Sequence, residues 1–195
     1  MSLEHLFRAL ATVCDGELEI ERVARRALDQ SAAVASATGT LATLPKAFDS
    51  ILVACDAHPV CADIARTPLP WAIPQTSDNP AYVEDSRKKL IVELVGPDGV
   101  VTANDIRVGL YGIAPGVHYG YRTHPAEEIF IMLAGAAEWA KGTADFKTLR
   151  SGERAYHPSM TRHATITRDD AFLSLYVWYG DVSYSEYEYQ GKEGA

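Results

Sequence analysis

Basic residues are scarce in this chain of 195 residues. Lysine and arginine number 18 against 26 aspartates and glutamates, the formal net charge is −8, and no basic run compensates it. A protein that neutralises a phosphate backbone needs clustered positive charge on one face or segment. Nucleic acid is therefore not expected as a partner.

Cysteine and long apolar runs are also scarce. The three cysteines, Cys14, Cys55 and Cys61, are an odd number without C-x-x-C spacing, which is typical of reduced thiols in a cytoplasmic protein. No segment approaches the roughly 20 apolar residues that cross a bilayer. The acidic N-terminus lacks the basic region and the cleavage site of a signal peptide. We therefore predict a cytoplasmic protein with no membrane anchor.

Periodicity predicts helices in the first third of the chain. Apolar residues recur at helical spacing over residues 3–13 and 20–28, and a third helix is expected to begin near Pro45 and to end by His58-Pro59. The following segment TPLPWAIPQTSDNP is rich in proline and has no periodicity. It predicts an irregular connector, with a short helical turn after it.

The rest of the chain has the pattern of short strands. The apolar runs are KLIVELV, DIRVGLYGI, EIFIMLAG, AAEWA, FKTL, RAYH, HATITR and AFLSLYVWY, with turn sequences between most of them. We predict an α+β, mainly β protein in which a helical cap and connector, residues 1–87, precede a single barrel, residues 88–195. The tail with Tyr184, Tyr187 and Tyr189 is expected to lie extended on the barrel.

Four of the six histidines fall between residues 118 and 163, inside the strand-rich part. His124 and Glu128 are separated by three residues across a short turn and can face one cavity, which His163 can reach from another strand. Imidazole and carboxylate groups on a rigid sheet are ligands for a divalent transition metal: zinc, iron, manganese, cobalt or nickel. The sequence therefore predicts a metal site, with His124, Glu128 and His163 as ligands.

The spacing of these residues matches two motifs of a known superfamily. The first, G(X)5HXH(X)3E(X)6G, is met by Gly116, His124, Glu128 and Gly135, with Arg122 at the first histidine. The second, G(X)5PXG(X)2H(X)3N, is met by Gly152, Pro158 and His163, with Met160 and Thr167 at the second glycine and the asparagine. In these motifs the chain resembles the cupin superfamily. The resemblance implies a double-stranded β-helix barrel.

Arg122 departs from the motif, and its protonated guanidinium has no lone pair for a metal. The site then has three protein ligands or takes a fourth, for which His118 is the best candidate and Tyr119 and Tyr121 are others. Arg122 itself is interpreted as a solvated loop residue, as a counter-charge to Glu127, or as a clamp for a substrate carboxylate.

The segments HYGYRTHPAEEIFIMLAG and ERAYHPSMTRHATIT resemble the cupin dimethylsulfoniopropionate lyases of marine bacteria, in particular the DddL type. The resemblance implies a small zwitterionic substrate that β-elimination cleaves to dimethyl sulfide and acrylate. It also implies that the metal binds the substrate carboxylate and stabilises the charge that develops there.

Related lyases of the DddQ type are thought to use a tyrosine base two residues after the glutamate, where this chain has Phe130. Tyr121 and Tyr119, and after them Tyr156, are the candidates to replace it, with His118 as an alternative base.

A sulfonium cation is best recognised by aromatic faces. Tyr176 and Trp178, expected on alternating faces of one strand, and Trp139 on another strand are the candidates, although strand aromatics more often pack in a core. His157, which precedes Pro158, is expected to be structural.

Two other classes of function remain open. Cupins also include metal-dependent dioxygenases and sugar-phosphate isomerases, and dioxygenases use the same kind of ligand set. A metal-sensing or ligand-sensing protein without activity is the third hypothesis, although the helices carry no recognition signature for DNA or a sigma factor. Barrels with exposed strand edges often pair, so a homodimer is a further expectation.

Overall fold

The computed structural model describes residues 2–192 and begins with helices. The α-helices are α1 (Leu3–Val13), α2 (Glu19–Ser31), α3 (Asp49–Leu52), α4 (Cys61–Arg66) and α5 (Pro80–Ser86), with 3-10 turns η1 (Ala32–Val34) and η2 (Lys46–Phe48). The third predicted helix is shorter than expected, because turns replace it after Leu52. Helix α4 was not predicted, since the proline that ends one helical pattern at Pro59 also stands just before the next helix.

Within residues 2–192, ten strands follow the helices and form one continuous sheet. They are β1 (Lys89–Gly96), β2 (Val101–Thr102), β3 (Ile106–Ile113), β4 (His118–Thr123), β5 (Glu127–Lys141), β6 (Lys147–Arg150), β7 (Arg154–His157), β8 (His163–Ile166), β9 (Phe172–Tyr179) and β10 (Glu188–Gly191). Their order is β10-β4-β8-β5-β9-β3-β1-β2, with β6 and β7 also paired to β5. The predicted α+β class, with N-terminal helices and a cupin-type barrel, is confirmed.

Strand β5 closes the barrel because it belongs to both walls. Its first half pairs with β9 and β7, and its second half pairs with β6 and β8. The sequence predicted two strands here, EIFIMLAG and AAEWA, but the chain runs through Gly135 without a break. Gly135 has a φ of +72°, and a Cβ there would lie 2.0 Å from the carbonyl oxygen of Ala171. Only glycine allows the strand to bend this closely against its neighbour.

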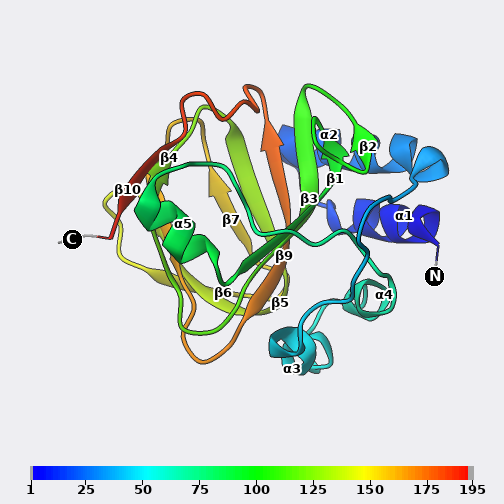
Figure 1. The fold of residues 1–195 in the computed structure, drawn as a ribbon, viewed down its shortest axis with the longest axis horizontal. Coiled ribbons are helices and arrows are strands. Elements are labelled where there is room, and N and C mark those ends of the chain that lie inside the picture. The colour runs from blue at the N-terminus through cyan, green and yellow to red at the C-terminus, as the bar shows by residue number, and fades with distance from the viewer. Residues whose placement is uncertain (1, 193–195) are drawn as a thin grey trace.

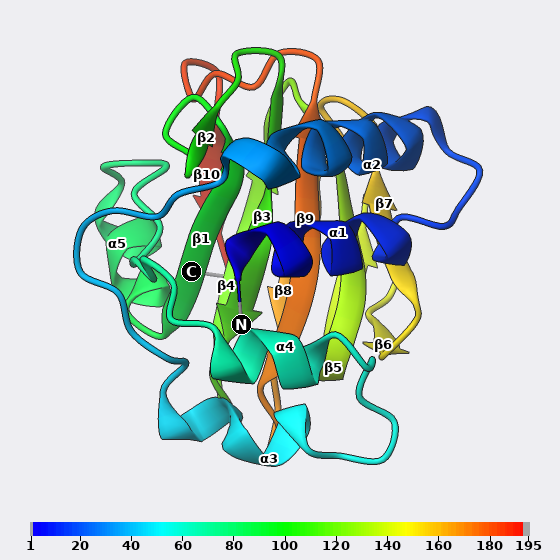
Figure 2. The same cartoon turned by 90° about the vertical axis from the view of Figure 1, so that its right-hand side faces the viewer.

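The helices cover one face of the sheet (Figures 1 and 2). In Figure 2, α1 and α2 cross in front of β1, β3, β9 and β5, while α3 and α4 lie near one end of these strands. Side chains of the helices and of these strands share one apolar core, which includes Leu6, Leu10, Ile129, Leu175 and Val177. Because helices and strands share this core, the division of the chain into two units at residue 88 stays a prediction.

The other face of the same strands points into the barrel. Side chains alternate along a strand, so Ile129 packs under the helices while Glu128 and Phe130 face inward. The same rule corrects the prediction for Tyr176 and Trp178: the two residues are two positions apart and both point into the barrel.

The C-terminal strand and α5 complete the barrel. Strand β10 pairs with β4, and α5 lies beside these two strands in Figure 1. The predicted extended tail is confirmed for Tyr189, whose strand runs antiparallel to β4.

Among the described residues, no helix is both long enough and apolar enough to cross a membrane.

Candidate metal centre

Three side chains converge inside the barrel from separate places in the chain. His124 lies in the turn between β4 and β5, Glu128 lies at the start of β5, and His163 begins β8. Their ligand atoms all lie within 4.8 Å of one another, and all three side chains are buried. Glu128 Oε2 is 3.0 Å from His163 Nε2 and 3.6 Å from His124 Nε2. The structure thus brings together the three residues that the sequence predicted as ligands.

Backbone carbonyls fix the tautomers of both histidines. Nδ1 of His124 lies 3.0 Å from the carbonyl oxygen of Ala126, and Nδ1 of His163 lies 2.7 Å from that of Thr161. A carbonyl oxygen only accepts, so each Nδ1 carries the proton and each Nε2 keeps a lone pair. Both Nε2 atoms are buried without a hydrogen-bond partner among the described residues. This is the arrangement that a metal ion would satisfy.

Glu128 is oriented by two aromatic neighbours. Trp178 donates its indole N–H to Oε1 at 2.6 Å and stacks on His124, with 4.2 Å between ring centroids. His157 Nδ1 lies 3.2 Å from Oε2. Burial alone would raise the pKa of Glu128, but the interactions of its carboxylate with His124, His157 and His163 outweigh burial and hold this pKa well below its usual value. The carboxylate is therefore ionised, as a metal ligand requires.

His157 is a part of the site that the sequence reasoning missed. Besides its contact with Glu128, its ring stacks on His163 with 4.1 Å between centroids. Burial lowers the pKa of both histidines, that of His163 well below its ordinary value, so the imidazoles are neutral at neutral pH. His157 reaches the site because β7 pairs with β5 and places His157 opposite Glu128. The spacing of residues in the sequence does not reveal this pairing.

Two of the predicted site residues, Tyr121 and His118, lie away from these ligands. Tyr121 packs with Phe146 and His118 also contacts Phe146, in a cluster separate from the barrel interior. A register shift in β4 between Tyr119 and Arg122 turns Tyr121 outward. The structure does not bring Tyr121, a candidate base, or His118, a candidate fourth ligand, to the three ligands, so both roles stay predictions from the sequence.

Tyr156 is also misplaced for catalysis at these ligands. Its strand register pairs it with Ile129, whose side chain points toward the helices. The hydroxyl donates to Glu127, and this hydrogen bond is the first cause of a pKa raised to about 12. Tyr156 lies on the opposite face of the sheet from Glu128, so the structure does not bring this candidate base to the ligands.

The remaining predicted residues stay close to the ligands. Tyr176, Trp178, Tyr119 and Arg122 line a cavity with a free volume of about 40 Å³ that also reaches Glu128. Trp139 is buried beside it and packs on Phe130 and His157, with ring centroids 4.7 and 5.8 Å away. The sequence analysis did not place four further tyrosines in this cavity, Tyr82, Tyr111, Tyr184 and Tyr187. We call this space the inner cavity.

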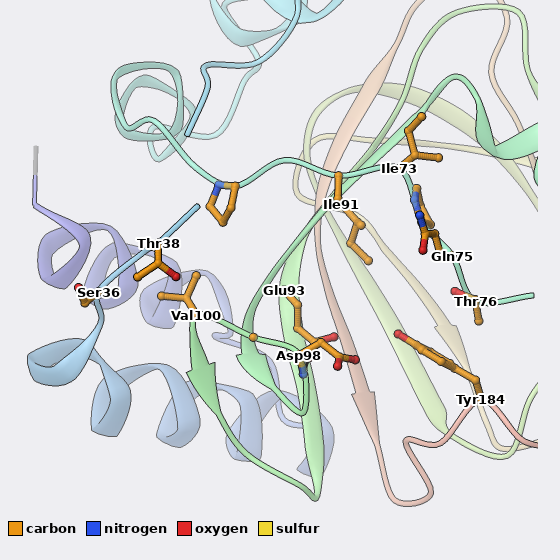
Figure 3. A pocket seen from close by; sticks show the side chains of 14 residues that line it. Ser36, Thr38, Ile73, Gln75, Thr76, Ile91, Glu93, Asp98, Val100 and Tyr184 are labelled. Carbon is orange, nitrogen blue, oxygen red and sulfur yellow. Dashed lines mark hydrogen bonds between the residues drawn. The ribbon is translucent and has the colours of Figure 1, made fainter. Parts of the chain in front are cut away.

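A wider pocket adjoins the inner cavity on the outside of the barrel (Figure 3). It has a volume of about 610 Å³, and the two spaces share Pro74, Thr76, Ile91 and Tyr184 as lining residues. Figure 3 shows Glu93 and Asp98 together on one side and Tyr184 across from them. The outer pocket and the inner cavity therefore lie side by side, with these four residues between them.

The fold and the ligands define a cupin-type protein with a candidate metal site of two histidines and one glutamate. The family model of dimethylsulfoniopropionate lyases matches residues 60–174, which is more than half of the chain. The chain therefore belongs to the dimethylsulfoniopropionate lyase family. This confirms the resemblance at the level of the family.

Individual relatives agree with this assignment. The chain is 35% identical to dimethylsulfoniopropionate lyase DddQ of Ruegeria pomeroyi over 89 residues, which are 46% of this chain and 44% of the relative. The match thus spans less than half of that protein. Among solved structures, the crystal structures of DMSP lyases RdDddP and RnDddQII are similar with a TM-score of 0.60 at 23% identity, covering 94% of this chain and 98% of that one. DMSP lyase DddQ from Ruegeria pomeroyi DSS-3 gives a TM-score of 0.50 at 23% identity, covering 95% and 78%. At this identity the structures support the fold.

Proposed function

We propose that this protein is a metal-dependent carbon-sulfur lyase that cleaves dimethylsulfoniopropionate to dimethyl sulfide and acrylate. The observation that carries the proposal is the convergence of His124, Glu128 and His163 on an aromatic cavity, in a chain of the dimethylsulfoniopropionate lyase family. A zwitterion of this kind needs a cationic partner for its carboxylate, a base beside the adjacent carbon and aromatic faces for the sulfonium. The lining of the inner cavity offers all three.

The three ligands would hold a zinc, iron, manganese, cobalt or nickel ion. Such an ion, when bound, supplies a Lewis acid that stabilises the negative charge developing on the substrate carboxylate. Trp178 and His157 keep Glu128 oriented for it, and Nδ1 hydrogen bonds to the backbone keep His124 and His163 oriented.

Tyr119 is the base that this arrangement favours among the predicted tyrosines. It lines the inner cavity, and its hydroxyl lies 2.6 Å from that of Tyr187, which gives its proton a partner. Burial, and then Tyr187, raise the pKa of Tyr119 well above its ordinary value, whereas the nearby Arg122 lowers it. The phenol therefore depends on nearby positive charge before it can accept a proton.

The elimination balances with these groups alone. The base takes a proton from the carbon next to the carboxylate, the electron pair of that bond forms the new double bond, and the bond from the next carbon to sulfur breaks. Neutral dimethyl sulfide leaves and acrylate remains. Tyr176 and Trp178, now on the same face of β9, offer aromatic surface to the sulfonium before it departs.

The test is headspace detection of dimethyl sulfide, with acrylate measured in solution, from the purified chain mixed with dimethylsulfoniopropionate. Samples loaded with each of several divalent metals are compared with a chelated sample. Metal-dependent release of both products in equal amounts supports the lyase. If neither product is released with any metal, the lyase proposal is contradicted. Oxygen uptake without release of dimethyl sulfide would favour the dioxygenase hypothesis. A cytoplasmic location and a homodimer stay predictions from the sequence.

A further inference from the structure

Two arginines line the inner cavity, and their surroundings differ. Arg107 forms two ion pairs: its Nη1 lies 2.6 Å from Glu93 Oε2 and 2.9 Å from Asp98 Oδ2. Its Nε donates to the carbonyl oxygen of Val182. This arginine is fully used by the fold, and its charge is balanced.

Arg122 has no such partner among residues 2–192. It is 2% exposed, and Nη2 donates only to the hydroxyl of Thr165 at 3.3 Å. The guanidinium carbon lies 4.0 Å from the centre of the Tyr119 ring, which is a favourable but neutral contact. Nη1 is buried without a hydrogen-bond partner. A buried charged donor left in this state is costly unless a ligand completes it.

The net charge of the inner cavity also indicates that a ligand binds beside Arg122. Besides the neutralised Arg107, the charged groups of its wall are Arg122 and Glu128, which cancel. Lys89 lies behind Tyr119, but burial, followed by the charge of Arg122, lowers the pKa of this amine well below its ordinary value. A divalent ion at the histidines and Glu128 would therefore leave two uncompensated positive charges inside the barrel. The interior then favours an anionic ligand.

We propose that Arg122 binds the carboxylate of the substrate through Nη1, at the position where the motif of this fold carries a metal-binding histidine. The assignment rests on the proposed function and deepens it, because it makes a carboxylate the feature that the site selects. A carboxylate has two oxygens, so one can accept from Arg122 while the other faces His124, Glu128 and His163.

The inference also gives the substrate a direction. Arg122, Glu128 and Tyr184 line the inner cavity, and Tyr184 also lines the outer pocket, which contains Glu93 and Asp98 (Figure 3). A molecule with its carboxylate on Arg122 leaves its other end toward the aromatic side of the cavity. The site therefore takes short monocarboxylates whose far end is apolar or cationic, and it discriminates against the corresponding amides.

The experiment measures the binding of propionate to the full chain by calorimetry, first after chelation and then with zinc. Chelation removes the metal as an alternative partner, so binding to that sample reports on Arg122. We expect Arg122→Gln to raise the dissociation constant for propionate about 10- to 100-fold, as for the loss of a charge-assisted hydrogen bond. Arg168→Gln is the matched control, because Arg168 is exposed and pairs with Glu138; it should leave binding unchanged.

A second variant separates anchoring from metal binding. Arg122→His restores the histidine of the motif, so we expect it to keep or increase zinc affinity while it loses propionate affinity in the chelated sample. Wild-type affinity for propionate in both variants overturns the proposal. If neither variant folds, the wild-type protein decides: propionate must bind far better than propionamide in the chelated sample, and equal binding of the two overturns the proposal.

The outcomes separate this inference from the proposed function. Propionate binding that depends on Arg122, in a protein that releases no dimethyl sulfide, supports the carboxylate anchor and contradicts the lyase. If dimethyl sulfide is released but propionate binds equally well without Arg122, the lyase is supported and the proposed role of Arg122 as carboxylate anchor is overturned.

Discussion

The two faces of the central strands have different compositions and different tasks. Toward the helices, β5 and β9 present aliphatic side chains such as Ile131 and Leu175, which pack in a closed apolar core. Toward the inner cavity, the same strands present Phe130, Tyr176 and Trp178, among polar atoms that lack a partner. One face provides stability, and the other keeps unsatisfied groups ready for ligands. Substitutions on the two faces should therefore affect different measurements.

The largest effect is expected on the cavity face. His163→Ala removes one of three ligands, so we expect bound metal to fall to background and turnover to fall more than about 100-fold. Metal analysis of the purified variant and the dimethyl sulfide assay check this. The fold should persist, since the helix-covered core is untouched; full metal content in the variant would contradict the site.

The matched substitution on the helix-covered face is Leu175→Ala. Leu175 is fully buried there, so the cavity left behind should lower the free energy of unfolding by about 2–5 kcal/mol. Denaturant unfolding measures this loss, and metal content should stay at the wild-type level. Loss of metal from the folded variant would show that the two faces are not independent.

A smaller effect is expected from Trp178→Phe. The ring against His124 is kept, but the N–H that donates to Glu128 is lost. We expect metal affinity to fall about 10- to 100-fold, as for other partners that orient a metal ligand. Competition with a chelator gives the affinity. An unchanged affinity would mean that packing alone orients Glu128.

The smallest effect, with the opposite sign, is expected from Lys89→Met. Nζ of Lys89 is buried without a hydrogen-bond partner, 3.2 Å from the centre of the Tyr119 ring. An apolar side chain should raise the free energy of unfolding by about 1–3 kcal/mol at neutral pH. Lys147→Met, at an exposed position of β6, is the control.

The pH dependence sharpens this prediction. The pKa of Lys89 is lower in the folded than in the unfolded chain, mainly because of burial. The unfolded chain therefore binds more protons below its own lysine pKa of about 10.4, and wild-type stability should rise with pH toward that value. The gain from Lys89→Met should accordingly shrink between about pH 7 and pH 10. A gain that does not change with pH would contradict a lowered pKa.

The sequence predicted the metal ligands because motif spacing transfers directly to position in this fold. His124, Glu128 and His163 required only that one turn and one further strand face the same interior. The alternation of side chains also follows from sequence, so the prediction that Tyr176 and Trp178 point to opposite faces was an avoidable error.

The rest of the site depends on pairings that the sequence does not contain. The register shift in β4 brings Tyr119 and Arg122 to one side although they are three residues apart, and it turns Tyr121 away. His157 and Tyr187 reach the site from β7 and from the C-terminal segment, through contacts across 29 and 68 residues. Local periodicity carries no information on either event.

The small free volume of the inner cavity imposes an order of events on any turnover. A space of about 40 Å³ holds about three water molecules, which is less than a substrate with a carboxylate and a dimethylated sulfur needs. We therefore expect the stretch that carries Tyr184 and Tyr187, between β9 and β10, to move aside when a ligand enters. If it does, its opening rate sets an upper bound on turnover.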